Sequence, residues 1–378
     1  MQVDNLSIDC DFPGGNIIVD RMEGDNVYLH QDLRDTGIDW FYWYFRLRGA
    51  AGRTLRFHFT QSEAIGARGP AVSLDGGAHW AWLGTAAVEG QTFGYSIPPG
   101  THDVRLSFTI PYLASDLAAF VQRHAQNPHL KKDVLCRTPR GRSAELLYLG
   151  QLTGMPDHRV LLTARHHACE SMATFSLEGL MDEVLTGVGK GHWLREHVEF
   201  LVIPFVDKDG VEDGDQGKCR MPHDHWEDYG EPSLYPTVQA IKQLVPKWAE
   251  GRLRFALDLH CPWIHGGSHE MIHFVGDPDL AHWQRVERFC EILEDTYIDS
   301  LPYHVSNNLP FGVSWNTDGG APRTFSRWVA TIPGVIASTL IEIPYANVEG
   351  MTVTSETARA FGRDLAHALH DYLQEVAR

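Results

Sequence analysis

The sequence predicts an α/β protein in which an N-terminal antiparallel β-sandwich precedes a mixed-sheet α/β/α domain. Up to about residue 115, short aromatic and apolar runs alternate with turn residues, a pattern typical of a sandwich. After residue 130, apolar strands alternate with helical patterns, which is typical of a sheet covered by helices on both faces. We therefore predict a sandwich domain at 1–115 and a larger α/β domain at 130–378.

The strands of the first domain are predicted from four segments, at 40–47, 54–60, 71–84 and 104–112. The third segment holds an Asp-Gly-Gly turn between two apolar runs, which is a hairpin signal. From residue 115 the pattern becomes helical, with Ser115 as a candidate N-cap. The boundary between the domains is therefore expected within 113–133.

The second domain is expected to hold four buried strands, at 159–164, 199–206, 254–260 and 334–343. Helices are predicted between them and at the end of the chain. One of these helices begins at Pro236 and stops at Pro246. Because functional groups of an α/β sheet lie at the carboxyl ends of its strands, the active site is expected there.

The acidic composition argues against several classes of partner. The 378 residues include 49 acidic and 32 basic side chains, which gives a formal charge of −17. Binding to nucleic acid or to an anionic membrane needs clustered Lys and Arg, so neither partner is expected. The six cysteines form no CxxC pair, and the first residues lack the basic stretch of a secretory signal. We therefore expect a cytoplasmic protein with reduced thiols.

Polar residues stand where the apolar strands of the second domain end. His167 and Glu170 follow the first of these strands, His260 ends the third, and Glu342 lies inside the fourth. Two histidines and a carboxylate with one open position form a catalytic zinc set, and a nearby carboxylate can accept a proton from zinc-bound water. Structural interpretations also exist. The histidines could be ordinary polar residues at element ends, and Glu342 could belong to a buried ion pair.

Five motifs together resemble those of the zinc metallocarboxypeptidases, specifically the cytosolic carboxypeptidase-like branch. They are HHACE (166–170), PFVDKDGVEDGDQGKCR (204–220), DHWEDY (224–229), LDLH (257–260) and TLIEI (339–343). The resemblance covers about residues 130–375. GNIIVD (15–20) and the aromatic strand at 40–47 resemble the sandwich that precedes the catalytic domain in this branch.

The resemblance implies a role for each matched residue. One zinc ion would be held by His167, Glu170 and His260. Glu342 would act as general base and acid, and Arg220 would stabilise the oxyanion of the tetrahedral intermediate. Asp224 would orient the first histidine ligand. His166 competes with His167 for the position of that ligand, and the family pattern favours His167.

The sequence departs from the family at the residues that grip the terminal carboxylate of the substrate. Trp226 and Glu227 stand where the family has Asn-Arg, and Trp315 replaces a carboxylate-binding tyrosine. An acidic side chain in place of an arginine would repel a carboxylate. Two explanations stay open. Arg323 or Arg327 could supply the missing positive charge, or the substrate has no free carboxylate and Glu227 favours an amine, a guanidinium or a neutral group.

These observations lead to three hypotheses for function. The first is a zinc-dependent, carboxypeptidase-like hydrolase of peptide or amide bonds, whose substrate is a peptide or an amide-containing small molecule. The second is an amidase or deacylase on the same scaffold, acting on a substrate without a free C-terminal carboxylate. The third is a catalytically idle zinc-containing binding protein. A salt bridge from Glu227 to Arg220 or Arg323 is the structural alternative for that residue. The sequence gives no indication of the oligomeric state.

Overall fold

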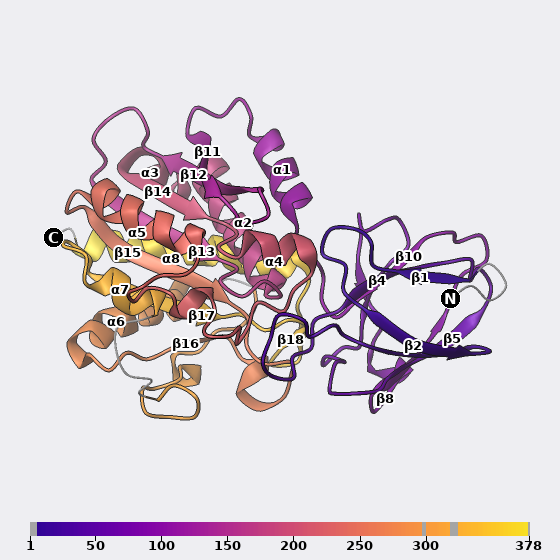
Figure 1. Cartoon of the computed structure of the whole chain (residues 1–378). Helices are drawn as coiled ribbons and strands as arrows, with labels where there is room; N and C mark the ends of the chain where they lie inside the picture. Colours follow the sequence, from indigo (N-terminus) through magenta and orange to yellow (C-terminus); the bar gives the residue numbers. More distant parts are fainter. Residues whose placement is uncertain (1–5, 297–299, 318–323, 377–378) are drawn as a thin grey trace.

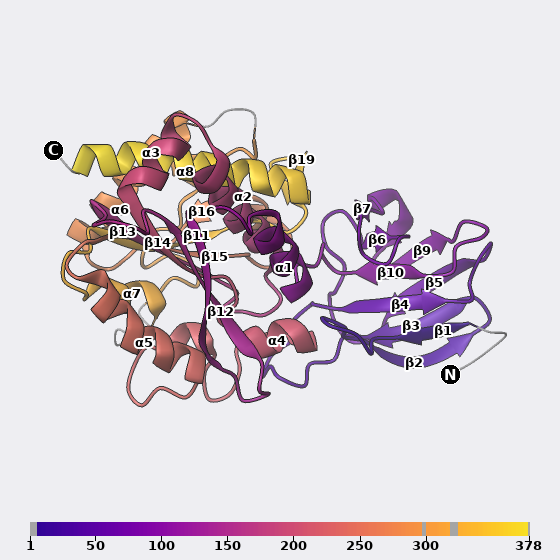
Figure 2. The ribbon, with the colours of Figure 1, turned by 90° about the horizontal axis from the view of Figure 1, so that it is seen from above.

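The computed structural model describes residues 6–296, 300–317 and 324–376. A smaller β-rich part, formed by the N-terminal residues, lies beside a larger α/β part (Figures 1 and 2). This arrangement confirms the predicted fold class. The exact division at 1–115 and 130–378 stays a prediction, because apolar side chains from both parts form one continuous core.

Two five-stranded sheets make up the N-terminal part. The first has the order β1 (Ser7–Asp9), β4 (Tyr44–Arg48), β10 (Val104–Ser107), β6 (Ala71–Ser73) and β7 (Ala81–Trp82). The second has the order β2 (Ile18–Glu23), β3 (Asn26–His30), β5 (Thr54–Phe59), β9 (Thr92–Ser96) and β8 (Val88–Glu89). Buried aromatic rings fill this part; Trp43 and Phe57 both stack on Phe93.

One strand pair of the sandwich departs from the antiparallel prediction. β3 and β5 are parallel, whereas the other paired strands of these two sheets are antiparallel. Between them the chain crosses to the other sheet as β4 and then returns, so β5 runs in the same direction as β3.

A mixed seven-stranded sheet forms the centre of the larger part. Its order is β11 (Leu130–Arg137), β12 (Ser143–Gly150), β14 (Val198–Ile203), β13 (His158–Ala164), β15 (Leu253–His260), β17 (Ala337–Glu342) and β16 (His273–Phe274). The four predicted strands are β13, β14, β15 and β17, which lie side by side and parallel. β11 and β12 form an antiparallel hairpin at one edge that was not predicted. Its outer strand is largely exposed and lacks the apolar run used to identify the others.

Helices cover both faces of this sheet (Figure 2). One face packs against α2 (Ser171–Thr186), α3 (Lys190–His197), α6 (Leu280–Thr296) and α8 (Ser355–Val376), and the other against α5 (Pro236–Ala249) and α7 (Phe325–Ala330). The other α-helices and strands of the described residues are α1 (Ala114–Arg123), α4 (Lys208–Asp213) and the two-stranded pair β18 (Asn347–Val348) and β19 (Met351–Thr352). Short 3-10 helices lie at Thr85–Ala87, His225–Glu227, Gly267–Glu270 and Val305–Asn307. α5 continues through Pro246 to Ala249, past its predicted end. Among the described residues, no helix is long and apolar enough to cross a membrane.

Candidate functional site

Three side chains meet at the carboxyl ends of two neighbouring parallel strands. His167 and Glu170 follow β13, and His260 is the last residue of β15. Nδ1 of His167 lies 2.8 Å from one carboxylate oxygen of Glu170, and Nδ1 of His260 lies 2.9 Å from the other. The two Nδ1 atoms are 3.2 Å apart. All three residues are buried, so the donor atoms face one another away from solvent.

This donor set fits a catalytic zinc ion. Nε2 of His260 lies 2.6 Å from Asp258 Oδ2, and Nε2 of His167 lies 3.4 Å from Asp224 Oδ2. With protons on Nε2, both Nδ1 lone pairs point at the same small space, an arrangement that a cation stabilises. Two histidines and one carboxylate are the usual protein ligands of a catalytic zinc, which keeps its fourth position open. The residues therefore suit a metal, and the neighbouring imidazoles keep Glu170 ionised despite its burial.

That ionisation follows from opposing effects on the pKa of Glu170. Burial raises the pKa, but the two imidazoles beside the carboxylate lower it well below its ordinary value. For His260, burial lowers the pKa while Asp258 and Glu170 raise it, and the carboxylates dominate. The ionised carboxylate of Glu170, between the two imidazoles, therefore favours binding of a cation.

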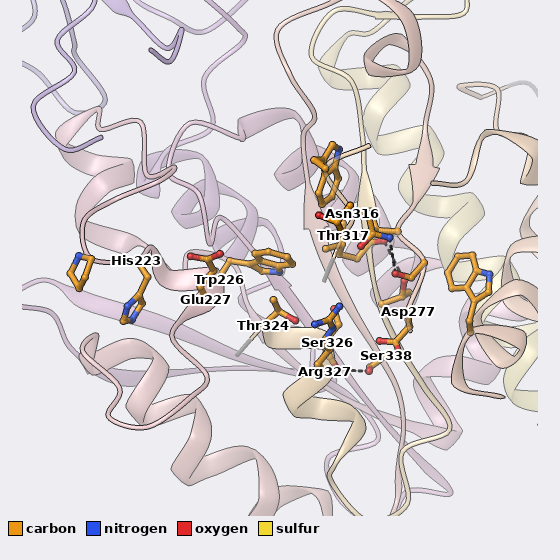
Figure 3. A pocket seen from close by; sticks show the side chains of 17 residues that line it. His223, Trp226, Glu227, Asp277, Asn316, Thr317, Thr324, Ser326, Arg327 and Ser338 are labelled. Carbon is orange, nitrogen blue, oxygen red and sulfur yellow. Dashed lines mark hydrogen bonds between the residues drawn. The ribbon is translucent and has the colours of Figure 1, made fainter. Parts of the chain in front are cut away.

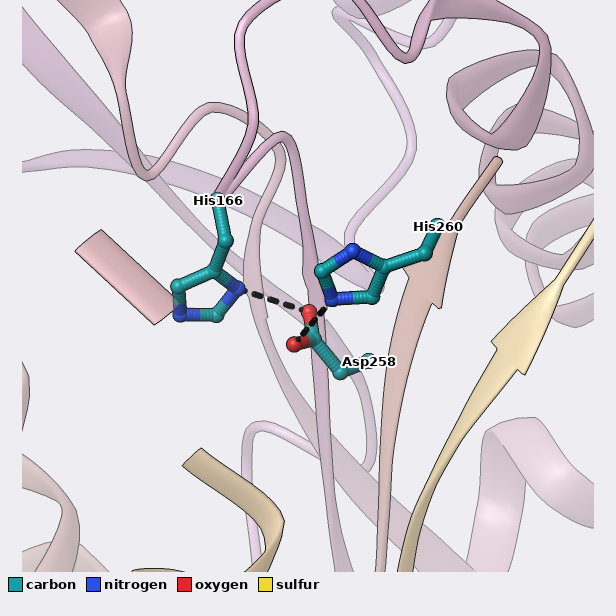
Figure 4. A group of neighbouring side chains, drawn as sticks. All are labelled: His166, Asp258 and His260. Carbon is teal, nitrogen blue, oxygen red and sulfur yellow. Dashed lines mark hydrogen bonds and ion pairs between the residues drawn. The ribbon is translucent and has the colours of Figure 1, made fainter. Parts of the chain in front are cut away.

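Asp258 joins the two histidines His166 and His260 (Figure 4). Its Oδ1 lies 2.8 Å from Nδ1 of His166, while its Oδ2 contacts His260. The second ring nitrogen of His166 lies 2.7 Å from the hydroxyl of Tyr229. The donor atoms of His166, Asp258 and His260 also lie close enough together to bind one metal ion. However, both nitrogens of His166 already have protein partners, whereas Nδ1 of His167 faces the donor set.

Glu342 lies next to this donor set. It ends β17 and pairs in register with His260 on β15. The side chain is buried, and its Oε2 has no hydrogen-bond partner among the described residues. Burial raises the pKa of Glu342, and the nearby charge of Glu170 raises it further. A carboxylate with an uncommitted oxygen and a raised pKa has the properties of a general base.

Arg220, for which the oxyanion role stays a prediction, pairs with three carboxylates. Its Nη2 lies 2.6 Å from Asp207 Oδ2, 3.1 Å from Asp215 Oδ2 and 3.5 Å from Asp35 Oδ2. These three carboxylates hold the guanidinium in a charged cluster. The cluster also explains why Arg220 is not paired with Glu227.

The ammonium of Lys218 lies next to the donor set, and Lys218 was not among the residues predicted from the sequence. Its Nζ lies 3.4 Å from Nδ1 of His167. Burial lowers the pKa of Lys218, but the carboxylates of Glu170, Asp224 and Glu342 raise it above its ordinary value. Lys218 and Arg220 stand two residues apart in one motif, Gly-Lys-Cys-Arg. The motif therefore indicated that a basic residue lies near the site, but it did not indicate whether that residue is Lys218 or Arg220.

Asp224 makes two kinds of contact, one with backbone N–H groups and one with His167. Its Oδ1 accepts a hydrogen bond from the Trp226 backbone N–H at 3.1 Å and caps the short 3-10 helix His225–Glu227. Its Oδ2 accepts from the Cys219 N–H at 3.0 Å and faces Nε2 of His167. Asp224 is thus a cap residue and a partner of a candidate ligand at the same time.

A cavity of about 430 Å³ adjoins the donor set, and its lining includes the predicted substrate residues Trp226, Glu227 and Trp315. The indole of Trp226 connects the two, because it lines the cavity and its ring centre lies 6.4 Å from that of His167 and 6.2 Å from that of His260. In Figure 3, Arg327 lies between Trp226 and Glu227 on one side and Asp277 on the other. Arg323 lies outside the described residues.

Glu227 and Arg327 are charged side chains that line this cavity. Glu227 is exposed, and within the described part of the chain it forms no ion pair. Arg327 also has no ion pair there, and its guanidinium lies 5.7 Å from the ring centre of Phe311. The cavity therefore presents one guanidinium, that of Arg327, and two carboxylates, those of Glu227 and Asp277, to a ligand.

Comparisons with known proteins agree with the geometry. No family model matches the chain. Human cytosolic carboxypeptidase 1 is 26% identical over 245 residues, covering 58% of this chain, and mouse cytosolic carboxypeptidase 6 is 24% identical over 269 residues, covering 64%. The matches span only 19% and 46% of those two relatives.

Solved structures match over nearly the whole chain. A metallo-carboxypeptidase from Burkholderia cenocepacia is 21% identical with a TM-score of 0.79, and the match covers 98% of this chain and 100% of that one. A metallo-carboxypeptidase from Pseudomonas aeruginosa, in complex with (2-guanidinoethylmercapto)succinic acid, gives 19% identity, a TM-score of 0.80 and the same coverage. Both parts of the fold, including the N-terminal sheets, are therefore present in these structures.

Proposed function

Because the chain is a distant homologue of the cytosolic carboxypeptidases within the zinc metallocarboxypeptidase family, we propose that it is a zinc-dependent hydrolase of peptide or amide bonds. The observation that carries the proposal is the buried convergence of His167, Glu170 and His260 beside Glu342. A binding protein has no need for a buried, unpartnered carboxylate next to a metal-ligand set, because such a group destabilises the fold.

Each side chain around the site has a distinct task in this proposal. Zinc, when bound by the two histidines and Glu170, supplies Lewis acidity that activates water and polarises a carbonyl. Glu342 accepts the proton of the attacking water and later delivers it to the leaving amine. Asp224 and Asp258 hold the two imidazoles in the orientation that directs Nδ1 inward.

Lys218 takes the role first expected of Arg220. An ammonium close to the ligand set stabilises negative charge that develops on the substrate carbonyl oxygen. Arg220 is held by three carboxylates and would act on the fold of its own loop instead.

The substrate is proposed to be a peptide with a free carboxylate that pairs with Arg327. The support is the uncommitted guanidinium in the cavity behind Trp226, together with the carboxypeptidase names of the relatives. The alternative is an amidase or deacylase without that requirement, which the exposed carboxylate of Glu227 would favour.

The test compares pairs of peptides that differ only in a free or an amide-capped C-terminus. We expect one zinc per chain, hydrolysis of the free-acid peptides, and loss of hydrolysis in His167→Ala and Glu342→Gln. Arg327→Met should raise KM for the free acid and leave capped peptides unaffected, with the exposed Glu63→Gln variant as a control. Equal hydrolysis of both peptide types would favour the amidase, and zinc and ligand binding without turnover of either type would favour the binding protein.

A further inference from the structure

A loop at residues 213–220 lies between the N-terminal sandwich and the candidate metal centre. The sandwich holds this loop from one side through the side chains of Asn16 and Arg34. Asn16 Nδ2 donates to the Gly214 carbonyl at 2.7 Å, and Arg34 Nε lies 2.8 Å from Asp215 Oδ1. These contacts join residues almost two hundred positions apart in the sequence.

Asp35 makes the most direct of these contacts. Its two carboxylate oxygens accept the backbone N–H groups of Gln216 at 3.0 Å and Gly217 at 2.8 Å. The side chain of Asp35 is 5% exposed, and its Oδ2 also lies 3.5 Å from Arg220. The amide of Gln216 in turn exchanges two hydrogen bonds, at 2.8 and 2.9 Å, with the backbone of Tyr42.

The other side of the loop presses against the segment that carries the metal ligands. The Gln216 carbonyl accepts the Cys169 N–H at 3.1 Å. Gly217 has a φ of +76°, and a Cβ there would lie 2.0 Å from the Ala168 backbone nitrogen. The loop is therefore fixed from both sides immediately before Lys218, the residue that reaches His167.

We propose that the N-terminal sandwich contributes to the active site through Asp35. Asp35 is a positioning residue that holds the ammonium of Lys218 at the zinc ligands. Trp40, which follows in the same segment of the sandwich, adds to this support, because its ring centre lies 5.8 Å from Lys218 Nζ. The catalytic use of Lys218 rests on the proposed function. Its positioning by Asp35 does not, and it can be measured without any substrate.

The positioning is tested by zinc affinity in a double-mutant cycle of Asp35→Ala and Lys218→Met, measured by competition with a fluorescent chelator on the full chain. A positive charge beside a ligand nitrogen opposes a divalent cation, so Lys218→Met should tighten zinc binding about tenfold. Asp35→Ala should tighten it several-fold, because the loop relaxes and the ammonium moves away. The double variant should bind no more tightly than Lys218→Met alone.

Controls separate positioning from general damage. Asp35→Asn keeps one acceptor oxygen and should give a smaller effect than Asp35→Ala. Asp25→Ala removes an exposed partner of Arg53 in the same sandwich and should change nothing. If the effects of Asp35→Ala and Lys218→Met simply add, or if Asp35→Ala leaves zinc affinity unchanged in a folded protein, the positioning role is wrong.

Activity provides a second readout. If the chain hydrolyses peptides, Asp35→Ala should lower kcat about tenfold with KM nearly unchanged, because the ammonium acts on the reacting carbonyl and not on substrate binding. Absence of hydrolysis in the wild type would count against the proposed function, while the zinc cycle would still decide the role of Asp35.

Discussion

Replacing Glu342 with glutamine should lower activity strongly and at the same time stabilise the metal-free protein. The carboxylate is buried, one of its oxygens has no hydrogen-bond partner among the described residues, and Glu170 adds negative charge nearby. Glutamine keeps the shape of the side chain and removes the charge. Loss of a general base lowers kcat by about 10²–10⁴-fold.

The size of the stabilisation follows from the environment of that oxygen. Leaving a buried polar group unpaired costs about 1–3 kcal/mol, and more when the group is charged. His260 and Lys218 offset part of this cost, since both lower the pKa of Glu342. We therefore expect Glu342→Gln to raise the free energy of unfolding by about 1–3 kcal/mol at pH 8.

The gain should depend on pH in a defined direction. An unfolded glutamate has a pKa of about 4.3, and the folded-state pKa of Glu342 lies above its ordinary value because of burial. Between the two values the folded wild type binds more protons than the unfolded chain, so its stability falls as pH rises. The advantage of Glu342→Gln should thus be absent below pH 4, grow through this range and stay constant above the folded-state pKa.

Urea denaturation of chelator-treated protein at several pH values measures this difference, with Glu63→Gln as an exposed control. A loss of stability in Glu342→Gln at pH 8 would refute the reasoning, because it would mean that the carboxylate makes favourable contacts in the folded state. An advantage that shrinks with rising pH would refute the assigned sign of the pKa shift.

Three further outcomes follow from the geometry. Asp258→Asn should weaken zinc binding about 10–100-fold in a chelator competition, because it removes the negative charge and one of the two oxygens that face the ring nitrogens of His166 and His260; unchanged affinity would contradict this orienting role. Arg220→Met should lower the free energy of unfolding in urea by about 3–5 kcal/mol, since three facing carboxylates lose their cation, whereas the exposed Arg21→Met should have little effect. Lys218→Met should lower kcat about 100-fold in steady-state assays, with partial recovery in Lys218→Arg; a change confined to KM would place the ammonium in substrate binding instead.

The four central strands and the candidate ligands were predictable for a shared physical reason. A buried strand needs an apolar run, and a polar residue that interrupts or ends such a run stands out, as His260 and Glu342 do. Asp258 was within reach of the same reasoning, because residues two apart on a strand share a face. The motif Asp-Leu-His thus already placed the carboxylate beside its histidine.

The choice between Lys218 and Arg220 could not be made from the sequence. Both are basic residues of one irregular loop, and no periodicity indicates where their side chains point. The direction is set by contacts with Asp35 and Asp207, which are distant in the chain or belong to another turn. The hairpin β11–β12 escaped prediction for a different reason, since its exposed outer strand carries mostly polar residues.

The hydrogen bonds from the sandwich to the loop at 213–220 also bear on how such proteins change over evolution. Asn16, Asp35 and the backbone at Tyr42 fit one particular loop of the partner part, and Gly217 leaves that loop no room to adjust. Exchanging the sandwich for an unrelated module would break these bonds and expose the shared apolar core. The two parts must therefore be inherited together, and substitutions at Asp35 and at residues 216–218 are expected to be correlated among descendants of this chain.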